Sequence, residues 1–263
     1  MAGLLTQIEE EASDLAALLD FDLPDELGFE LPEELGFHLP EAPDLDIDDA
    51  DDADLVYMAI GASDVFGVGA SPLDNGYAFR IEDALEDRDT DVQLVTAAIP
   101  GGEVEAITDA VQLALLIGPE PDLVTVWVGA NDLVAGAEPE TFEEELDNLL
   151  DEFDSSGAVV AIADLPDLTQ LPRFRAVPVA TVTEERIAAF NEAIHDQAEA
   201  HDAVLVALSA QEVEDQFISD VDGFHPNDAG HAAIAELFLD AIGPEFGTEP
   251  LATLSTSDLD PLV

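Results

Sequence analysis

The chain has 263 residues and 48% hydrophobic content, enough for one sizeable domain with terminal segments, and its lack of cysteine excludes disulfides and thiolate metal sites. Its 62 acidic residues far outnumber the five basic ones, all arginine, and the net charge of −57 argues against nucleic acid or an anionic membrane as a partner. Such self-repulsion opposes the compact state in dilute buffer and is relieved by salt, which predicts a protein adapted to high salt.

The first 54 residues form an acidic leader without lysine or arginine. A short Phe-x-Leu-Pro repeat begins in it at Phe21, Phe29 and Phe37. Proline in every unit opposes a long helix and the charge opposes a packed core, so residues 1–54 are expected to be disordered apart from a short helix over 5–19. The start of the chain lacks the basic segment of a signal peptide, and no apolar run reaches the roughly 20 residues that span a bilayer.

From residue 55 onward, short apolar runs alternate with helical stretches. The apolar runs, which are of the buried-strand type, cover 55–60, 92–96, 123–128, 158–163 and 203–206. The helical stretches cover 76–87, 102–117, 140–153, 183–200 and 227–241. This alternation predicts one α/β domain over residues 55–245, with a five-stranded parallel sheet and helices on both of its faces. Residues 246–263 are expected to form a loose tail.

The candidate functional residues follow the predicted strands. In an open parallel sheet, ligands bind beyond the carboxyl ends of the strands. Ser63 follows the first predicted strand, Gly101 the second and Asn131 the third. Asp222 and His225 follow the fifth strand and precede the last helix, so they can reach the same edge of the sheet. The topology alone therefore brings these five residues together.

These residue types point to a serine hydrolase. Ser63 would be the nucleophile, and His225 could take its proton and return it to the leaving group, because imidazole has a pKa near 6.5. Asp222 could orient the second ring nitrogen of His225. The backbone N–H groups of Ser63 and Gly101 and the side chain of Asn131 would form an oxyanion hole. Each residue alone could be an ordinary turn or capping residue, so the hypothesis depends on their convergence.

Over residues 55–241 the chain resembles the SGNH, or GDSL-type, hydrolase family. The four namesake residues of that family correspond to Ser63, Gly101, Asn131 and His225, and its triad acid corresponds to Asp222. The elements Gly-x-Asn-Asp at 129–132 and Asp-x-x-His-Pro at 222–226 are specific in combination. The resemblance implies a three-layer α/β/α sandwich of the flavodoxin-like type and hydrolysis of a small-molecule ester through an acyl-serine intermediate. It implies no metal and no cofactor, and no third zinc ligand joins His225 and His231.

Two segments depart from the family's usual pattern. The segment around the nucleophile reads Gly61-Ala62-Ser63-Asp64 where the family usually has Gly-Asp-Ser-Leu, and the segment Thr96 to Gly101 lacks the asparagine that often precedes the glycine. Because both changes remove polar groups beside the site, the alternative to a serine esterase is a catalytically weak relative that binds an acyl or carbohydrate ligand. A nucleotide-binding protein is disfavoured, since Gly67-Val68-Gly69 lacks a third glycine and the chain has no lysine.

The segment 164–178 follows the fourth predicted strand and is expected to overhang the site. Leu171 and Phe174 would contact an acyl chain there. Arg173 and Arg175, two of the five arginines in the chain, would either steer an anionic substrate or pair with surrounding carboxylates. The residues leave open whether the ester is a lipid or an acetylated carbohydrate, what the oligomeric state is, and whether the protein works in a salt-adapted cytoplasm or outside the cell.

Overall fold

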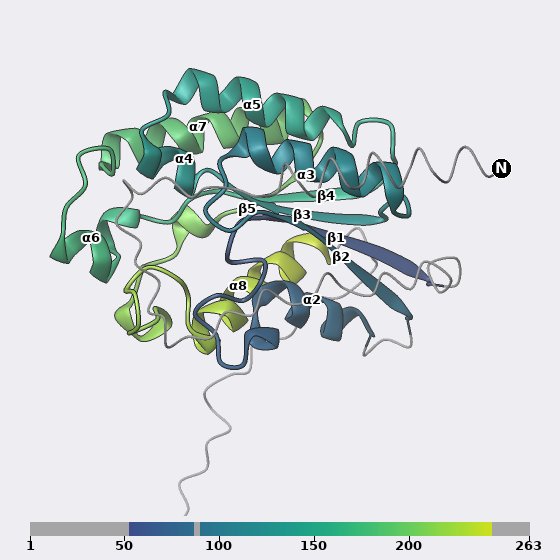
Figure 1. The fold of residues 1–263 in the computed structure, drawn as a ribbon, viewed down its shortest axis with the longest axis horizontal. Coiled ribbons are helices and arrows are strands. Elements are labelled where there is room, and N and C mark those ends of the chain that lie inside the picture. Colours follow the sequence, from purple (N-terminus) through teal and green to yellow (C-terminus); the bar gives the residue numbers. More distant parts are fainter. Residues whose placement is uncertain (1–52, 87–89, 244–263) are drawn as a thin grey trace, which may run out of the picture. The chain divides into compact units, whose positions relative to one another are not determined.

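Five parallel strands form the centre of the fold (Figure 1). The computed structural model of the chain describes residues 53–86 and 90–243. In the order in which they lie in the sheet, the strands are β2 (Val92–Ala98), β1 (Leu55–Gly61), β3 (Leu123–Trp127), β4 (Val159–Ala163) and β5 (Val204–Val206). Every residue of β1 is buried, as expected for a strand covered on both faces. The chain runs outward from β1 to β2 and then returns to β3, so the strand order reverses between β1 and β3.

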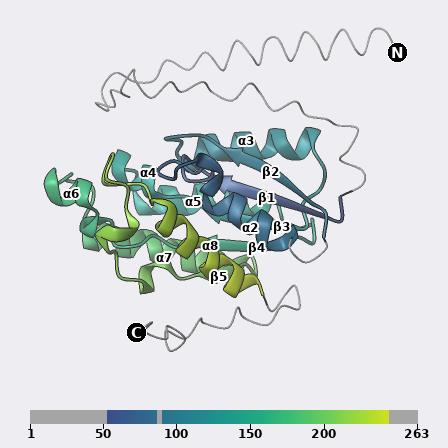
Figure 2. The ribbon, with the colours of Figure 1, turned by 90° about the horizontal axis from the view of Figure 1, so that it is seen from below.

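Helices cover both faces of this sheet (Figures 1 and 2). One layer contains α3 (Val104–Ile117), α5 (Pro139–Asp151) and α7 (Glu184–Ala200), and the other contains α2 (Tyr77–Glu86) and α8 (Asp228–Ile242). Side chains of β1 alternate between the two layers. Met58 and Ile60 pack in the cluster with α3, α5 and α7, whereas Tyr57 and Ala59 pack in the cluster with α2 and α8. The sheet therefore separates two hydrophobic cores, as its period of two residues requires.

The prediction of an α/β fold with a five-stranded parallel sheet is confirmed. The predicted helical stretches match α2, α3, α5, α7 and α8 within a few residues. Thr183 caps α7, because its side-chain oxygen accepts the backbone N–H of Arg186. The sequence analysis missed two short helices, α4 (Ala130–Ala135) and α6 (Pro172–Ala176), which are too short to show a periodic pattern. The predictions for the leader and for the tail lie outside the described residues, and within those residues no helix is both long and apolar enough to cross a membrane.

The acidic composition leaves carboxylates close to one another on the folded surface. On α2, burial and the neighbouring charges of Glu86 and Asp83 raise the pKa of Glu82 to about 7. Arg175 forms an ion pair with Asp215, and Arg186 forms one with Glu138. Five arginines cannot neutralise 62 acidic residues, so we expect screening by salt to relieve the remaining repulsion.

We expect the midpoint of thermal unfolding to rise by about 10 °C between 0.05 M and 2 M KCl, which corresponds to a few kcal/mol of relieved repulsion in a domain of this size. Calorimetry at pH 7.5 would measure the shift. The same comparison at pH 4.5 serves as the control, because the carboxylates then take up protons and the effect of salt should shrink. Equal midpoints in the two salt concentrations at pH 7.5 would contradict the expectation.

Candidate active site

Ser63 lies just beyond the carboxyl end of β1, at the reversal of the strand order. The strand ends at Gly61, where a Cβ atom would lie 2.6 Å from the backbone oxygen of Trp127 on β3, so only glycine allows the two strands to approach this closely. The chain then turns, and the backbone oxygen of Ser63 accepts the N–H groups of Phe66 and Val68, each at 3.2 Å. The turn holds the serine at the edge of the sheet rather than in the core.

Ser63, His225 and Asp222 form a continuous chain of hydrogen bonds. Ser63 Oγ lies 2.8 Å from Nε2 of His225, and Nδ1 of the same ring donates to Oδ2 of Asp222. The other carboxylate oxygen of Asp222 accepts the backbone N–H groups of Phe224 and His225 at 2.9 and 3.1 Å. The turn that carries both residues therefore fixes the carboxylate, and the carboxylate fixes the ring with Nε2 directed at the serine.

The charges around the ring shift both pKa values toward the ion pair. Burial raises the pKa of Asp222, but the hydrogen bonds from His225 and from the backbone outweigh it, and the pKa lies below its ordinary value. Burial lowers the pKa of His225, whereas the hydrogen bond to Asp222 and the nearby charge of Asp64 raise it. Arg173 acts in the opposite direction, and the pKa of His225 ends above its ordinary value. The imidazolium form is thus stabilised in place.

Gly101 and Asn131 follow β2 and β3, the strands on either side of β1, and a hydrogen bond connects the segments that carry them. Gly101 lies between β2 and α3 with φ of 75°, and a Cβ atom there would meet nothing within 4 Å. Asn131 lies in the first turn of α4, and its Nδ2 donates to the backbone oxygen of Gly102 at 2.9 Å. This bond uses one of the two amide hydrogens, which fixes the side chain and leaves the second hydrogen available to a ligand.

The sequence analysis assigned no role to Asp132, which is fully buried beside Asn131. Its Oδ1 accepts the backbone N–H of Val104, the first residue of α3, at 2.9 Å, and no described residue bonds its Oδ2. Together with the bond from Asn131 to Gly102, this contact ties α4 to the loop that carries Gly101. Burial, partly offset by the backbone bonds, raises the pKa of Asp132 to about 6. The signal in the sequence was the aspartate that ends the Gly-x-Asn-Asp element.

His231 also supports the site from a buried position on α8. Its Nδ1 accepts the backbone N–H of Tyr77 at 3.2 Å, and its Nε2 donates to the backbone oxygen of Val68 at 3.1 Å. The ring is neutral in this arrangement, and burial lowers its pKa. His231 therefore links the turn after Ser63 to both α2 and α8, and it acts as a structural bridge rather than a metal ligand.

The residues that could share a cation lie elsewhere. Within the described part of the chain, the acidic and histidine side chains close enough to do so are Asp147, Asp151 and His201, at the ends of α5 and α7. Both ring nitrogens of His201 already bond carboxylates, those of Asp154 and Asp147, and these carboxylates raise the pKa of His201 above its ordinary value although burial opposes the shift. None of these residues belongs to the site around Ser63.

The segment after β4 carries the four residues that were predicted to contact the substrate, and they face different surroundings. Leu171 is buried and lines a cavity that Ala62 and Asn131 also line. Phe174 packs edge-on against Phe224, whose ring in turn stands edge-on to His225. Arg175 is exposed and forms an ion pair with Asp215. The backbone N–H of Arg173 donates to the backbone oxygen of Gly223, the residue after Asp222, at 2.9 Å. Pairing with a carboxylate thus accounts for Arg175, and steering of an anionic substrate stays a prediction.

A parallel sheet in the order 2-1-3-4-5 places the protein in the doubly wound, flavodoxin-like class of α/β folds, and here a hydrogen-bonded Ser–His–Asp chain lies at the switch point of the sheet. The sequence model of the GDSL-like lipase/acylhydrolase family matches residues 59–233, more than half of the chain. The chain therefore belongs to this family, and the predicted resemblance is confirmed. A GDSL-like esterase of Mycobacterium tuberculosis is 29% identical to it over 114 residues, which are 42% of this chain and 36% of that relative. The chain thus matches about a third of the length of that relative.

Solved structures share the fold. The esterase EstA from Pseudoalteromonas sp. superposes with a TM-score of 0.60 at 19% identity, over 74% of this chain and all of that one. LAE5, an α/β hydrolase from the metagenome of Lake Arreo in Spain, superposes with a TM-score of 0.57 at 24% identity, over 73% of this chain and 96% of that one. At these identities the likeness shows the common architecture.

The raised pKa of Asp132 yields a test of its burial. The folded protein keeps this proton up to about pH 6 while the unfolded chain loses it near pH 4, so the stability of the parent falls as the pH rises through this window. The substitution Asp132→Asn removes the titration and keeps an oxygen for Val104. We expect the variant to gain about 3 kcal/mol relative to the parent between pH 4 and pH 7.

Urea unfolding in 2 M KCl would measure this difference, and Asp109→Asn, at an exposed position on α3, is the matched control. A stability difference between Asp132→Asn and the parent that does not change with pH would show that Asp132 is ionised in the fold throughout this range.

Proposed function

We propose that the protein is a serine esterase that cleaves carboxylic esters through an acyl-serine intermediate. The observation that carries this proposal is the hydrogen-bonded chain from Ser63 Oγ through His225 to Asp222, at the switch point of the sheet. Membership of the GDSL-like lipase/acylhydrolase family supports an ester as the substrate.

In the first step, Ser63 Oγ attacks the ester carbonyl carbon while Nε2 of His225 takes the hydroxyl proton. The resulting imidazolium is held by Asp222, whose hydrogen bond already stabilises the charged ring. The carbonyl oxygen becomes an oxyanion. Its donors would be the backbone N–H groups of Ser63 and Gly101 and the second amide hydrogen of Asn131.

In the second half of the reaction, the tetrahedral intermediate collapses and the ester C–O bond breaks. His225 gives its proton to the departing alcohol, and the acyl group stays on Ser63. A water molecule then attacks the acyl carbon while His225 accepts one of its protons, and collapse of this second intermediate returns the proton to Ser63 Oγ. The carboxylic acid leaves, and the hydrogen-bonded chain is restored.

The departures from the family pattern do not interrupt this chain. Ala62, which stands where the family usually has an acid, is buried and lines the cavity, while the acid that follows the nucleophile, Asp64, acts electrostatically on His225. The alternative of a ligand-binding relative with weak catalysis rests on Ala62 and Thr96 alone. The bond already formed between Ser63 and His225 favours the esterase.

The substitution Ser63→Ala should reduce kcat/KM for p-nitrophenyl butyrate by at least about 10³-fold, because the nucleophile and the acyl intermediate are lost together. The assay is run in 2 M KCl at pH 8, with folding verified by circular dichroism. The matched control is Ser71→Ala, an exposed serine of the same loop region, which should keep the parent rate. Equal activity of Ser63→Ala and the parent would exclude Ser63 as the nucleophile.

The pH dependence of kcat/KM tests the base. His225 must be neutral to accept a proton, and its pKa lies above the ordinary value, so activity should rise with pH through a midpoint above 6.5. The substitution Asp64→Asn removes a charge that raises this pKa and should move the midpoint to lower pH. Arg173→Gln should move it to higher pH. The remote control is Asp109→Asn, which should leave the midpoint unchanged. A midpoint that neither Asp64→Asn nor Arg173→Gln moves would argue against His225 as the titrating base.

A further inference from the structure

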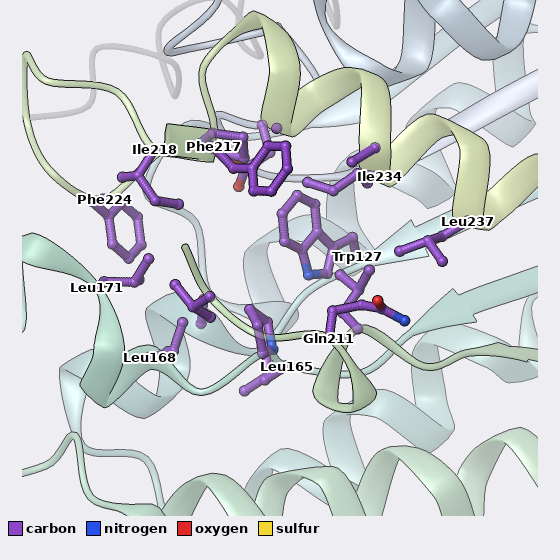
Figure 3. Close-up of a pocket in the computed structure, with 18 of the residues that line it drawn as sticks. Trp127, Leu165, Leu168, Leu171, Gln211, Phe217, Ile218, Phe224, Ile234 and Leu237 are labelled. Carbon is purple, nitrogen blue, oxygen red and sulfur yellow. The ribbon is translucent and has the colours of Figure 1, made fainter. Parts of the chain in front are cut away.

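A cavity of about 600 Å³ lies along the carboxyl ends of the strands, and the two chain neighbours of Ser63 are among the residues that line it (Figure 3). Next to Ser63 it is lined by Ala62 and Asp64, and on the oxyanion side by Asn131. We infer that this cavity holds the acyl chain of the ester, so that the protein acts on esters of medium-chain fatty acids rather than on acetate esters. The inference rests on the proposed esterase function and specifies its substrate.

The floor of the cavity is formed where three strands end. Trp127 is the last residue of β3, Leu165 follows β4 and Leu208 follows β5, so the cavity crosses the sheet edge from the centre toward β5. Figure 3 shows Trp127 and Leu165 turned toward the same space. Trp127 is only partly buried although it is the largest apolar side chain in the chain, because one part of it faces this cavity. An occupant would cover that part.

One wall of the cavity is a stripe on α8. The helix contributes Gly230, Ala233, Ile234 and Leu237, which recur at the spacing of one helix face. The small residues lie near His225 and the larger ones farther along the helix. Ile234 and Leu237 are half-buried, and Figure 3 shows both beside Trp127. On α8 the lining of the cavity therefore consists of small residues toward His225 and of larger apolar side chains farther along the helix.

The opposite wall, residues 208–218, is tied to α8. Nδ2 of Asn227 donates to the backbone oxygens of Gln216 and Ile218 at 2.8 and 3.1 Å. A Cβ atom on Gly230 would lie 2.2 Å from the backbone oxygen of Phe217, so glycine is needed for the helix and this wall to touch. This wall and α8 are therefore in direct contact at the edge of the cavity.

The chemistry of the lining selects an uncharged chain. No lysine or arginine is among the described residues that line the cavity, whereas this lining includes the exposed residues Glu212, Glu214, Glu236 and Asp240. A terminal carboxylate on the substrate would meet these like charges without a partner. An acetyl group would leave most of about 600 Å³ unfilled, whereas a medium-length alkyl chain would bury its methylenes against Trp127, Ile234 and Leu237.

The acyl part suits this cavity better than the alcohol part. The alcohol departs first, and water must then reach the same side of the acyl-enzyme, so the alcohol needs a site open to solvent. The acyl chain stays attached to Ser63 until the last step and can lie along the apolar lining of the cavity. Placing the chain there also keeps the oxyanion donors on the cavity side, where Asn131 lies.

The first experiment compares two isomeric esters, ethyl octanoate and octyl acetate, by pH-stat titration in 2 M KCl. Ala233→Phe should block the cavity near the triad and reduce kcat/KM for ethyl octanoate at least tenfold, with octyl acetate changed by less than about twofold. Leu237→Trp lies about 6 Å farther along the helix axis and should produce a smaller loss for the same ester. The matched control is Ala229→Phe, which adds the same ring at an exposed position of α8 outside the lining.

In the parent, kcat/KM for p-nitrophenyl esters should rise from acetate to octanoate, by up to about fourfold for each added methylene. A loss in Ala233→Phe that falls on octyl acetate would place the alcohol in the cavity and overturn the inference. An equal loss for both esters, or a flat chain-length profile in the parent, would also overturn it. If any of these results were found while Ser63→Ala still abolished activity, the esterase proposal would stand and only the assignment of the cavity would fail.

The second experiment needs no turnover. Trp127 is the one tryptophan of the chain, so its fluorescence reports on the cavity directly. In Ser63→Ala, ethyl decanoate should shift the emission saturably, ethyl acetate should not, and Ala233→Phe in the same background should abolish the shift. No saturable shift with ethyl decanoate would overturn the cavity assignment. A saturable shift together with a parent that hydrolyses no ester would overturn the proposed function and keep the binding site.

Discussion

The reversal of strand order between β1 and β3 is the constraint on which the site depends. After β1 the chain passes to β2 on one side, and after β2 it crosses to β3 on the other side of β1. The loops that follow β1 and β3 therefore diverge at the carboxyl ends of these strands and leave room for a ligand. Ser63 stands at that point because Gly61 brings β1 and β3 into close contact before the chain turns. Asn131 and Gly101 enter from the strands on either side.

The triad depends equally on how α8 is attached to this edge. Asn227 caps the helix and bonds the preceding segment, while His231, one turn later, donates to Val68 in the turn after Ser63. His225 and Asp222, the proposed base and acid, lie just before this helix, and Ser63, the proposed nucleophile, lies at the start of that turn. Burial keeps His231 neutral, so one ring nitrogen accepts and the other donates. The neutral ring of His231 thus helps to fix the position of α8, and with it His225, relative to the turn that carries Ser63.

The sequence allowed the fold and the convergence of the candidate residues to be predicted, because the direction of a parallel strand decides where its following residue lies. It could not reveal the bond between Asp132 and Val104, since that contact joins the first turns of α4 and α3, whose packing depends on the whole core. Nor could it distinguish a helix stripe that lines a cavity from one that fills a core. Ile234 and Leu237 have the spacing of core residues, and only the assembled wall of residues 208–218 leaves space beside them.

The charge of −57 and the proposed role of His225 as general base impose opposite requirements, which high salt would reconcile. In dilute buffer the field of distant carboxylates would add to that of Asp64 and Asp222 and hold His225 in its protonated form, which cannot accept the proton of Ser63. At 1 M salt the screening length falls to about 3 Å, so the distant surface charges cease to act on the ring while the hydrogen bond to Asp222 persists. The pKa of His225 then depends on its immediate neighbours alone. Under such conditions an acidic surface and a neutral catalytic imidazole are compatible near pH 8.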